Sequence, residues 1–154
     1  MALPSENLAE LGLALPAVAT PVAAYVPATI DRGIARTSGQ LPMVEGQLAC
    51  TGAVGDNGTD PQEAYQAAQR AALNALAAAA SVAGGLDQLS GVVKVTGFVS
   101  SKPDFVGQAA VVNGASELFG KIFPDDGGHI RSAVGVAVLP LDASVEIEAE
   151  FSLR

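Results

Sequence analysis

Residues 131–151 read RSAVGVAVLPLDASVEIEAEF, where two runs of alternating larger and smaller side chains flank Leu139-Pro140-Leu141-Asp142. Successive side chains of a strand point to opposite faces of a sheet, so each run predicts a strand with two different faces. A turn in the flanked segment predicts that the two strands pair as a hairpin. The larger residues then share one face, and they are Ser132, Val134, Val136, Val138, Val145, Ile147, Ala149 and Phe151.

The opposite face of this hairpin is expected to carry one arginine and three glutamates among small residues, namely Arg131, Glu146, Glu148 and Glu150. One interpretation is a solvated outer face, which half-buried antiparallel sheets commonly have. The other is a site in which the arginine binds a carboxylate and a glutamate handles water. The hairpin alone leaves both interpretations open. Helices are expected to cover the face with the larger residues.

Two helices and a long strand are predicted in the middle of the chain. The first helix is expected from Asp60, as N-cap before Pro61, to about Val82, because Gly84-Gly85 can end it. Residues 89–101, LSGVVKVTGFVSS, predict the strand, and residues 108–123 predict the second helix from apolar side chains at helical spacing.

Shorter elements are predicted before Asp60. A small helix is expected over residues 5–13 with Ser5 as N-cap, and short strands are expected at residues 22–26, 30–38 and 47–50. The order of strands, helix, strand, helix and strand pair predicts an α+β fold with two helices on one face of a mixed sheet.

The composition favours one domain that associates with other copies. The chain has 154 residues, of which 49% are hydrophobic and 16% charged, so little polar surface is available to cover a monomer. The net charge of −8 and the lack of a basic run argue against nucleic acid and against an anionic membrane surface as partners. Residues 1–21 are interpreted as an N-terminal extension and residues 22–154 as the domain.

Cysteine and histidine are nearly absent. A single Cys50 allows no intrachain disulfide, and with a single His129 it cannot supply a Cys/His zinc site, so a buried inert thiol and no metal are expected. Glu6 and Glu10 replace the positive region of a signal peptide, and no apolar run reaches the length of a membrane span. The protein is therefore expected to be soluble and cytoplasmic.

Five pieces in this order resemble the Rid family of reactive intermediate deaminases, also called the YjgF family and also labelled L-PSP-like endoribonucleases. They are Tyr25, TSGQLP at residues 37–42, VNGA at 112–115, RSAV at 131–134 and LPLDASVEIEA at 139–149. The resemblance covers roughly residues 22–151. It implies a chorismate-mutase-like α+β fold and a homotrimer with a barrel-like arrangement of sheets, helices outside and sites between subunits.

The resemblance also implies an activity. Characterised members hydrolyse reactive 2-imino or enamine acids to 2-oxo acids and ammonia without metal or cofactor. Arg131 would grip the substrate carboxylate through parallel N–H···O bonds, and Glu146 would position or activate water. Substrate-binding positions of the family fall on further residues of this sequence, and these are Tyr25, Ser38, the Gly39 backbone, Asn113 and Ala133.

The chain departs from the family pattern in places. Ala133 stands where many members carry cysteine, residues 124–130 form a longer and more acidic connection, and residues 1–21 are additional. Three functions therefore stay open. The first is imine hydrolysis, the second is binding of 2-oxo acids or other small carboxylates with little turnover, and the third, which the acidic charge disfavours, is ribonuclease or translation-inhibitor activity.

Overall fold

The computed structural model describes residues 2–21, 23–126 and 128–154. Its strands are β1 (Ala28–Asp31), β2 (Ile34–Thr37), β3 (Met43–Val44), β4 (Gln47–Leu48), β5 (Leu89–Ser100), β6 (Ile130–Val136) and β7 (Val145–Leu153). Its helices are α1 (Pro4–Glu10), α2 (Pro61–Ala83) and α3 (Gln108–Ile122), with 3-10 turns η1 (Leu86–Gln88) and η2 (Pro140–Asp142).

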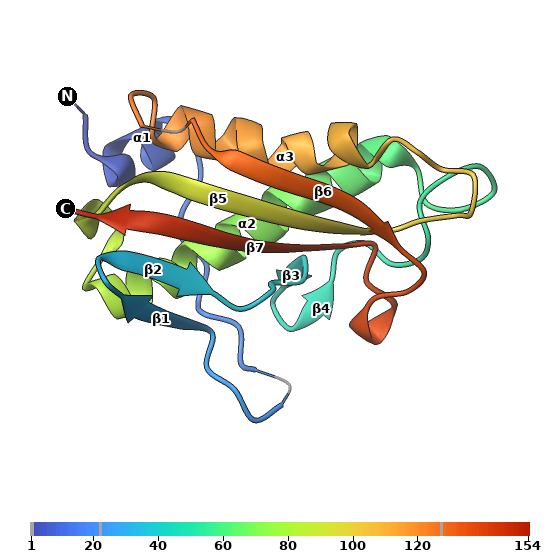
Figure 1. Ribbon diagram of the computed structural model, residues 1–154, viewed down its shortest axis with the longest axis horizontal. Coiled ribbons are helices and arrows are strands. Elements are labelled where there is room, and N and C mark those ends of the chain that lie inside the picture. Colours follow the sequence, from blue (N-terminus) through green and yellow to red (C-terminus); the bar gives the residue numbers. More distant parts are fainter. Residues whose placement is uncertain (1, 22, 127) are drawn as a thin grey trace.

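Five strands form one mixed sheet in the order β1-β2-β7-β5-β6, and β3 and β4 form a separate small hairpin (Figure 1). Helices α2 and α3 lie on one face of the large sheet, and no helix of the described residues covers the other face (Figure 1). The predicted α+β class and the placement of two helices on one face are confirmed. We refer to the two sides as the helix face and the open face.

The predicted pairing of the last two strands is wrong. Strand β5 lies between β6 and β7, because Val95 pairs with Arg131 of β6 in parallel and with Ala149 of β7 in antiparallel orientation. Helix α3 connects β5 to β6 as a crossover, which is the connection that parallel neighbours require. The short η2 segment then carries the chain past the end of β5 to its other edge, instead of forming a hairpin.

The predicted sharing of faces is wrong for the same reason. Arg131 points to the helix face together with Ala149, whereas Glu146 pairs with Phe98 and points to the open face. Val134, expected beneath the helices, is 43% exposed on the open face. Alternation along each strand was read correctly from the sequence, but the relation between the strands depends on the register of β5.

Helix α2 forms where its capping residues predict it. The Asp60 carboxylate accepts a hydrogen bond from the backbone N–H of Gln62 at 3.2 Å, and Gly84 ends the helix in the left-handed conformation. A Cβ atom on Gly114 of α3 would lie 2.1 Å from the Tyr65 carbonyl oxygen of α2, so glycine allows the two helices to approach closely. The alanine-rich side of α2 is buried against the sheet.

The core lies between the helices and the sheet. Phe119 of α3 meets Phe151 of β7 edge to face, with ring centroids 5.2 Å apart, and both side chains are fully buried. Cys50 is buried, its thiol lies 3.3 Å from the Ser144 hydroxyl oxygen, and burial raises its pKa. This environment suits the inert thiol that the sequence predicts.

The N-terminal residues pack onto the rest of the chain. Helix α1 begins at Pro4 with Leu3 as N-cap instead of Ser5, whose backbone N–H and hydroxyl both donate to the Asp87 carboxylate at 2.9 Å and 2.7 Å. The following residues run across α2 to reach β1 (Figure 1). No helix in the described ranges has both the length and the apolar character needed to cross a membrane.

Strand predictions near the N-terminus were less accurate. Val22, the first residue of one predicted strand, lies outside the described residues, residues 23–25 form bends, and Val26 is not part of a strand. The strand predicted over residues 30–38 is β2 together with the end of β1, joined by the turn at Arg32-Gly33. Gly127, in the acidic connection before β6, also lies outside the described residues.

Candidate functional site

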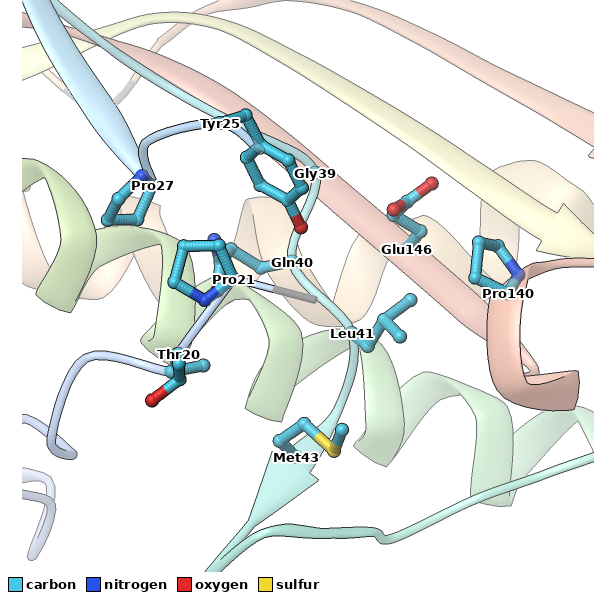
Figure 2. Close-up of a pocket in the computed structure, with 11 residues that line it drawn as sticks. Thr20, Pro21, Tyr25, Pro27, Gly39, Gln40, Leu41, Met43, Pro140 and Glu146 are labelled. Atoms are coloured by element: carbon cyan, nitrogen blue, oxygen red, sulfur yellow. The ribbon is translucent and has the colours of Figure 1, made fainter. Parts of the chain in front are cut away.

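A pocket on the open side of β7 gathers several of the predicted site residues (Figure 2). Its cavity has a volume of about 70 Å³. We call it the Glu146 pocket, and its lining residues are Ala19, Thr20, Pro21, Tyr25, Pro27, Gly39, Gln40, Leu41, Met43, Pro140 and Glu146. Three predicted site residues, Tyr25, Gly39 and Glu146, therefore lie together. The apolar walls lower the polarity around a single carboxylate.

Backbone pairing holds Gly39 beside Glu146. Gln40 and Ile147 exchange two backbone hydrogen bonds, with N···O distances of 2.7 and 2.9 Å, which ties residues 38–41 to β7. A Cβ atom on Gly39 would lie 2.6 Å from Glu146 Oε1, closer than such atoms approach. The carboxylate can occupy its position only because residue 39 has no side chain.

The surroundings of Glu146 change its acidity. Burial raises the pKa of the Glu146 carboxyl group, and the neighbouring Glu148 carboxylate raises it further. A raised pKa makes the deprotonated carboxylate a stronger base near neutral pH. This is the property that a group activating water needs.

Tyr25 and Ser38 have different relations to this pocket. The Tyr25 ring lines it and directs its hydroxyl into it (Figure 2), while 45% of the residue surface stays exposed. The Ser38 hydroxyl instead donates to the Val26 carbonyl oxygen at 2.6 Å, and the Ser38 N–H donates to the Pro27 carbonyl oxygen at 2.8 Å. Ser38 thus holds the bend that carries Tyr25 and is not part of the pocket lining.

A second group of polar residues surrounds Arg131 on the helix face. Its Nη1 donates to Asn113 Oδ1 at 2.7 Å and to Ser116 Oγ at 3.2 Å, and its Nη2 donates to the Ala109 carbonyl oxygen at 3.3 Å. All three acceptors belong to α3. We call Arg131, Asn113, Ser116 and His129 the Arg131 cluster. The structure thereby joins two predicted site residues, Arg131 and Asn113.

These contacts leave part of the guanidinium group available. Of its five N–H donors, the three bonds occupy both hydrogens of Nη1 and one of Nη2. Nε–H and the second Nη2–H remain, on the edge of the group that matches the two oxygens of a carboxylate. Ala133 follows on the same face and is half-buried against the core.

Ser116 and His129 were not predicted as site residues. Because a guanidinium only donates, Ser116 Oγ accepts from Arg131, and it also forms a hydrogen bond with His129 Nε2, 2.9 Å away. The sequence contained a signal for Ser116, since it follows Asn113 by three residues and therefore lies on the same side of a helix.

The two groups do not meet within one chain. Glu146 and its pocket lie on the side of the open face, whereas Arg131 lies on the helix face, beneath α3. Among residues 2–21, 23–126 and 128–154, no three His, Cys, Asp or Glu side chains come close enough together to hold a metal ion.

A protein family and a curated relative resemble this chain over most of its length. The family model described as "YjgF/chorismate_mutase-like, putative endoribonuclease" matches residues 5–150. Protein TCP17 of Trypanosoma cruzi is 40% identical over 149 residues, which are 96% of this chain and 92% of that protein.

Two solved structures resemble the chain over nearly its full length. Atu1372 of Agrobacterium tumefaciens, a protein of unknown function, is 44% identical with a TM-score of 0.87, over 99% of this chain and 94% of that one. A protein of Shewanella oneidensis MR-1, described as a putative endoribonuclease, is 29% identical with a TM-score of 0.93, over 99% of this chain and all of that one. Both similarities extend through the N-terminal residues.

Proposed function

The chain belongs to the YjgF/chorismate mutase-like family, and we propose that it hydrolyses 2-imino or enamine acids to 2-oxo acids and ammonia. The observation that supports this most is that the chain carries both a guanidinium edge on Arg131 that fits a carboxylate and, at Glu146, a carboxyl group of raised pKa. A 2-imino acid needs the same two functions. Its carboxylate must be held, and water must be delivered to its C=N bond.

The proposed reaction begins with the protonated imine. Glu146 accepts a proton from water as the water oxygen bonds to C2, and the electrons of the C=N bond move to nitrogen. Glu146 then returns that proton to the nitrogen, which leaves as ammonia. The C2–OH oxygen forms the carbonyl group, and its proton passes to the departing ammonia, which leaves the site as ammonium. Arg131 holds the carboxylate throughout, and the Tyr25 hydroxyl is placed to orient the water or the nitrogen.

We further propose that each site forms between two copies of the chain, as the family resemblance implies for a homotrimer. The open face of the sheet has no helix on it in the described residues, and the large apolar side chain of Val134 is exposed there. Because Arg131 and Glu146 face opposite sides of one sheet, a complete site requires the Arg131 cluster of one subunit beside the Glu146 pocket of another.

A second candidate is binding of small carboxylates without turnover. The specific observation in its favour is that Arg131 is already held in place by three hydrogen bonds, whereas the Glu146 pocket of a single chain has a volume of only about 70 Å³. Binding of a 2-oxo acid through Arg131 would need nothing from Glu146.

An imine-trapping assay tests the proposal. An amino-acid oxidase generates 2-imino acids in the presence of a trapping amine, and the protein is expected to divert them to 2-oxo acids. Arg131→Ala and Glu146→Gln are each expected to abolish that diversion. A folded protein that diverts no imine but binds 2-oxo acids through Arg131 would support the second candidate, and salt-sensitive cleavage of RNA would contradict both.

A further inference from the structure

A larger cavity lies next to the Glu146 pocket, beneath the N-terminal segment. We call residues 11–21 the strap, because they cross α2 between α1 and β1 (Figure 1). The strap cavity has a volume of about 680 Å³, and its lining residues are Ala14, Leu15, Pro16, Ala17, Val18, Ala19, Thr20, Met43, Glu45, Gly46, Arg70 and Asn74. This volume falls within the range of small-molecule sites, which are mostly apolar with a few placed polar groups.

Arg70 is the one cation of this lining. Its Nε donates to the Met43 carbonyl oxygen at 2.8 Å, and the side chain is half-buried. Within the described ranges no acidic side chain lies at ion-pair distance from it. A guanidinium has five N–H donors, so four remain without an acceptor among the residues that the structure describes. The half-buried guanidinium keeps contact with water, and its unoccupied donors are available to a bound anion.

The rest of the lining restricts the kind of anion. Leu15, Pro16, Val18 and Met43 provide apolar surface, and Glu45 at the β3–β4 turn adds a negative charge at the rim. A single guanidinium beside one carboxylate suits a ligand with one negative charge, and the apolar wall suits a hydrocarbon chain. A phosphate dianion would find one cation and, among the lining side chains, only the Thr20 hydroxyl and buried Asn74 as further donors, and Asn74 Nδ2 already donates to two carbonyl oxygens.

The strap cavity and the Glu146 pocket share part of their walls. Ala19, Thr20 and Met43 line both, and Figure 2 shows Thr20 and Met43 together at one end of the Glu146 pocket. Methionine is unbranched and flexible, so its side chain can adjust to a ligand on either side. A molecule bound in the strap cavity would therefore change the position of side chains that also form the wall of the Glu146 pocket.

We propose that the strap cavity is a second ligand site, for a monocarboxylate with an apolar chain. Its carboxylate is held by Arg70, and its chain lies along the strap toward Met43. This inference rests on the cavity and on Arg70, and it does not depend on imine hydrolysis.

Methionine NMR offers a direct test, because the chain contains only Met1 and Met43. The protein is labelled with ¹³C at the methionine methyl groups, Met43→Leu assigns the Met43 signal, and octanoate is the probe. Octanoate is expected to shift the Met43 signal, and the titration is expected to give a dissociation constant of about 1 mM or lower. Octylamine, which has the same chain and the opposite charge, is expected to leave the signal in place.

Two variants locate the ligand. Arg70→Gln is expected to weaken octanoate binding about 10-fold or more, since it removes charge-assisted hydrogen bonds. Arg32→Gln, which removes the same charge from a side chain that is 92% exposed, is expected to bind as the native protein does. Val18→Trp is expected to abolish binding by filling the cavity, and it decides the question if Arg70→Gln does not fold.

Three results would overturn the proposal. The first is a Met43 signal that does not move in the native protein up to about 10 mM octanoate. The second is unchanged affinity in folded Arg70→Gln, and the third is unchanged affinity in folded Val18→Trp. Because the readout is binding, none of these results bears on whether the protein hydrolyses imines.

Discussion

Arg131 and Glu146 flank β5 from its two edges and point to opposite faces of the sheet. Arg131 pairs with Val95 and lies under α3, and Glu146 pairs with Phe98 on the face that no helix in the described residues covers. Two groups separated in this way cannot act on one small molecule within one subunit. Their cooperation has to be sought between copies of the chain.

Mixed assemblies test that cooperation. Arg131→Ala and Glu146→Gln are each expected to be inactive alone, but co-expression should restore part of the imine hydrolysis. If every site takes one residue from each of two subunits, random mixing yields about one quarter of the native sites. Co-purified assemblies without activity, from partners shown to fold and associate, would contradict a site shared between subunits.

The pH dependence of the reaction should reflect the raised pKa of Glu146. The rate rises as Glu146 loses its proton, so the acidic limb of kcat/KM should lie above the range of an ordinary glutamate. Glu148→Gln removes a neighbouring negative charge, which lowers the pKa of Glu146 and should move that limb to lower pH. Glu10→Gln, an exposed residue at the end of α1, is the matched control. A limb that does not move in Glu148→Gln would assign it to another group.

The ionised Glu146 carboxylate should also lower the stability of the folded protein at neutral pH. Its pKa is raised in the folded protein, so the folded state binds the proton more tightly than the unfolded chain does. Stability is therefore lost as pH rises through the folded pKa. Glu146→Gln should raise Tm at pH 7 and change it less at pH 4, while kcat falls by about 100-fold or more. Calorimetry at the two pH values would reveal a variant that is destabilised instead.

A methyl group at position 39 should disturb the site without breaking the core. Gly39→Ala places a Cβ atom against the Glu146 carboxylate, so the carboxylate must move and kcat should fall by about 10-fold or more. Gly120→Ala, in α3 with nothing within 4 Å of the new atom, is the control and should leave activity unchanged. Equal activity in the two variants would mean that the position of this carboxylate does not matter for catalysis.

Ser116 should matter through Arg131. Ser116→Ala removes one of three hydrogen bonds that hold the guanidinium, so KM should rise by about 10-fold with a smaller change in kcat. Ser116→Thr keeps the hydroxyl group and should restore KM in part. Ser81→Ala, which loses a hydroxyl on α2, serves as the control. A fall in kcat alone would place Ser116 in a different role.

The sequence predicted individual elements better than their arrangement. The cap at Asp60, the long strand and the second helix follow from local rules, and all three lie close to their expected bounds. The pairing of β6 was missed because two partners were possible. A helical crossover through α3 makes β6 a parallel neighbour of β5, whereas a short turn would pair β6 with β7, and the position of β5 in the sheet decides between them. Spacing along a strand is local information, while the identity of its neighbour is not.

The site residues show the same difference between what is predictable from the sequence and what depends on the folded arrangement. The family resemblance predicted one site for all of these residues, whereas within one chain Tyr25, Gly39 and Glu146 form one group and Arg131 and Asn113 form another. The direction of the Ser38 hydroxyl was not predicted, because a serine beside a turn can bond to backbone as readily as it can face a ligand. Nor did spacing indicate that residues 19–21, at the end of the N-terminal extension, would line the pocket.

The strap has a consequence for how such a protein can diversify. It follows α1, which is fixed where Asn7 donates to the Ile122 carbonyl oxygen at 2.9 Å. It contains no charged residue, and three of its alanines line the large cavity without taking part in any proposed chemistry. Variants with larger side chains in place of those alanines would change which molecules the cavity accepts while leaving the reacting groups intact. Selection can therefore act on ligand choice and on chemistry separately.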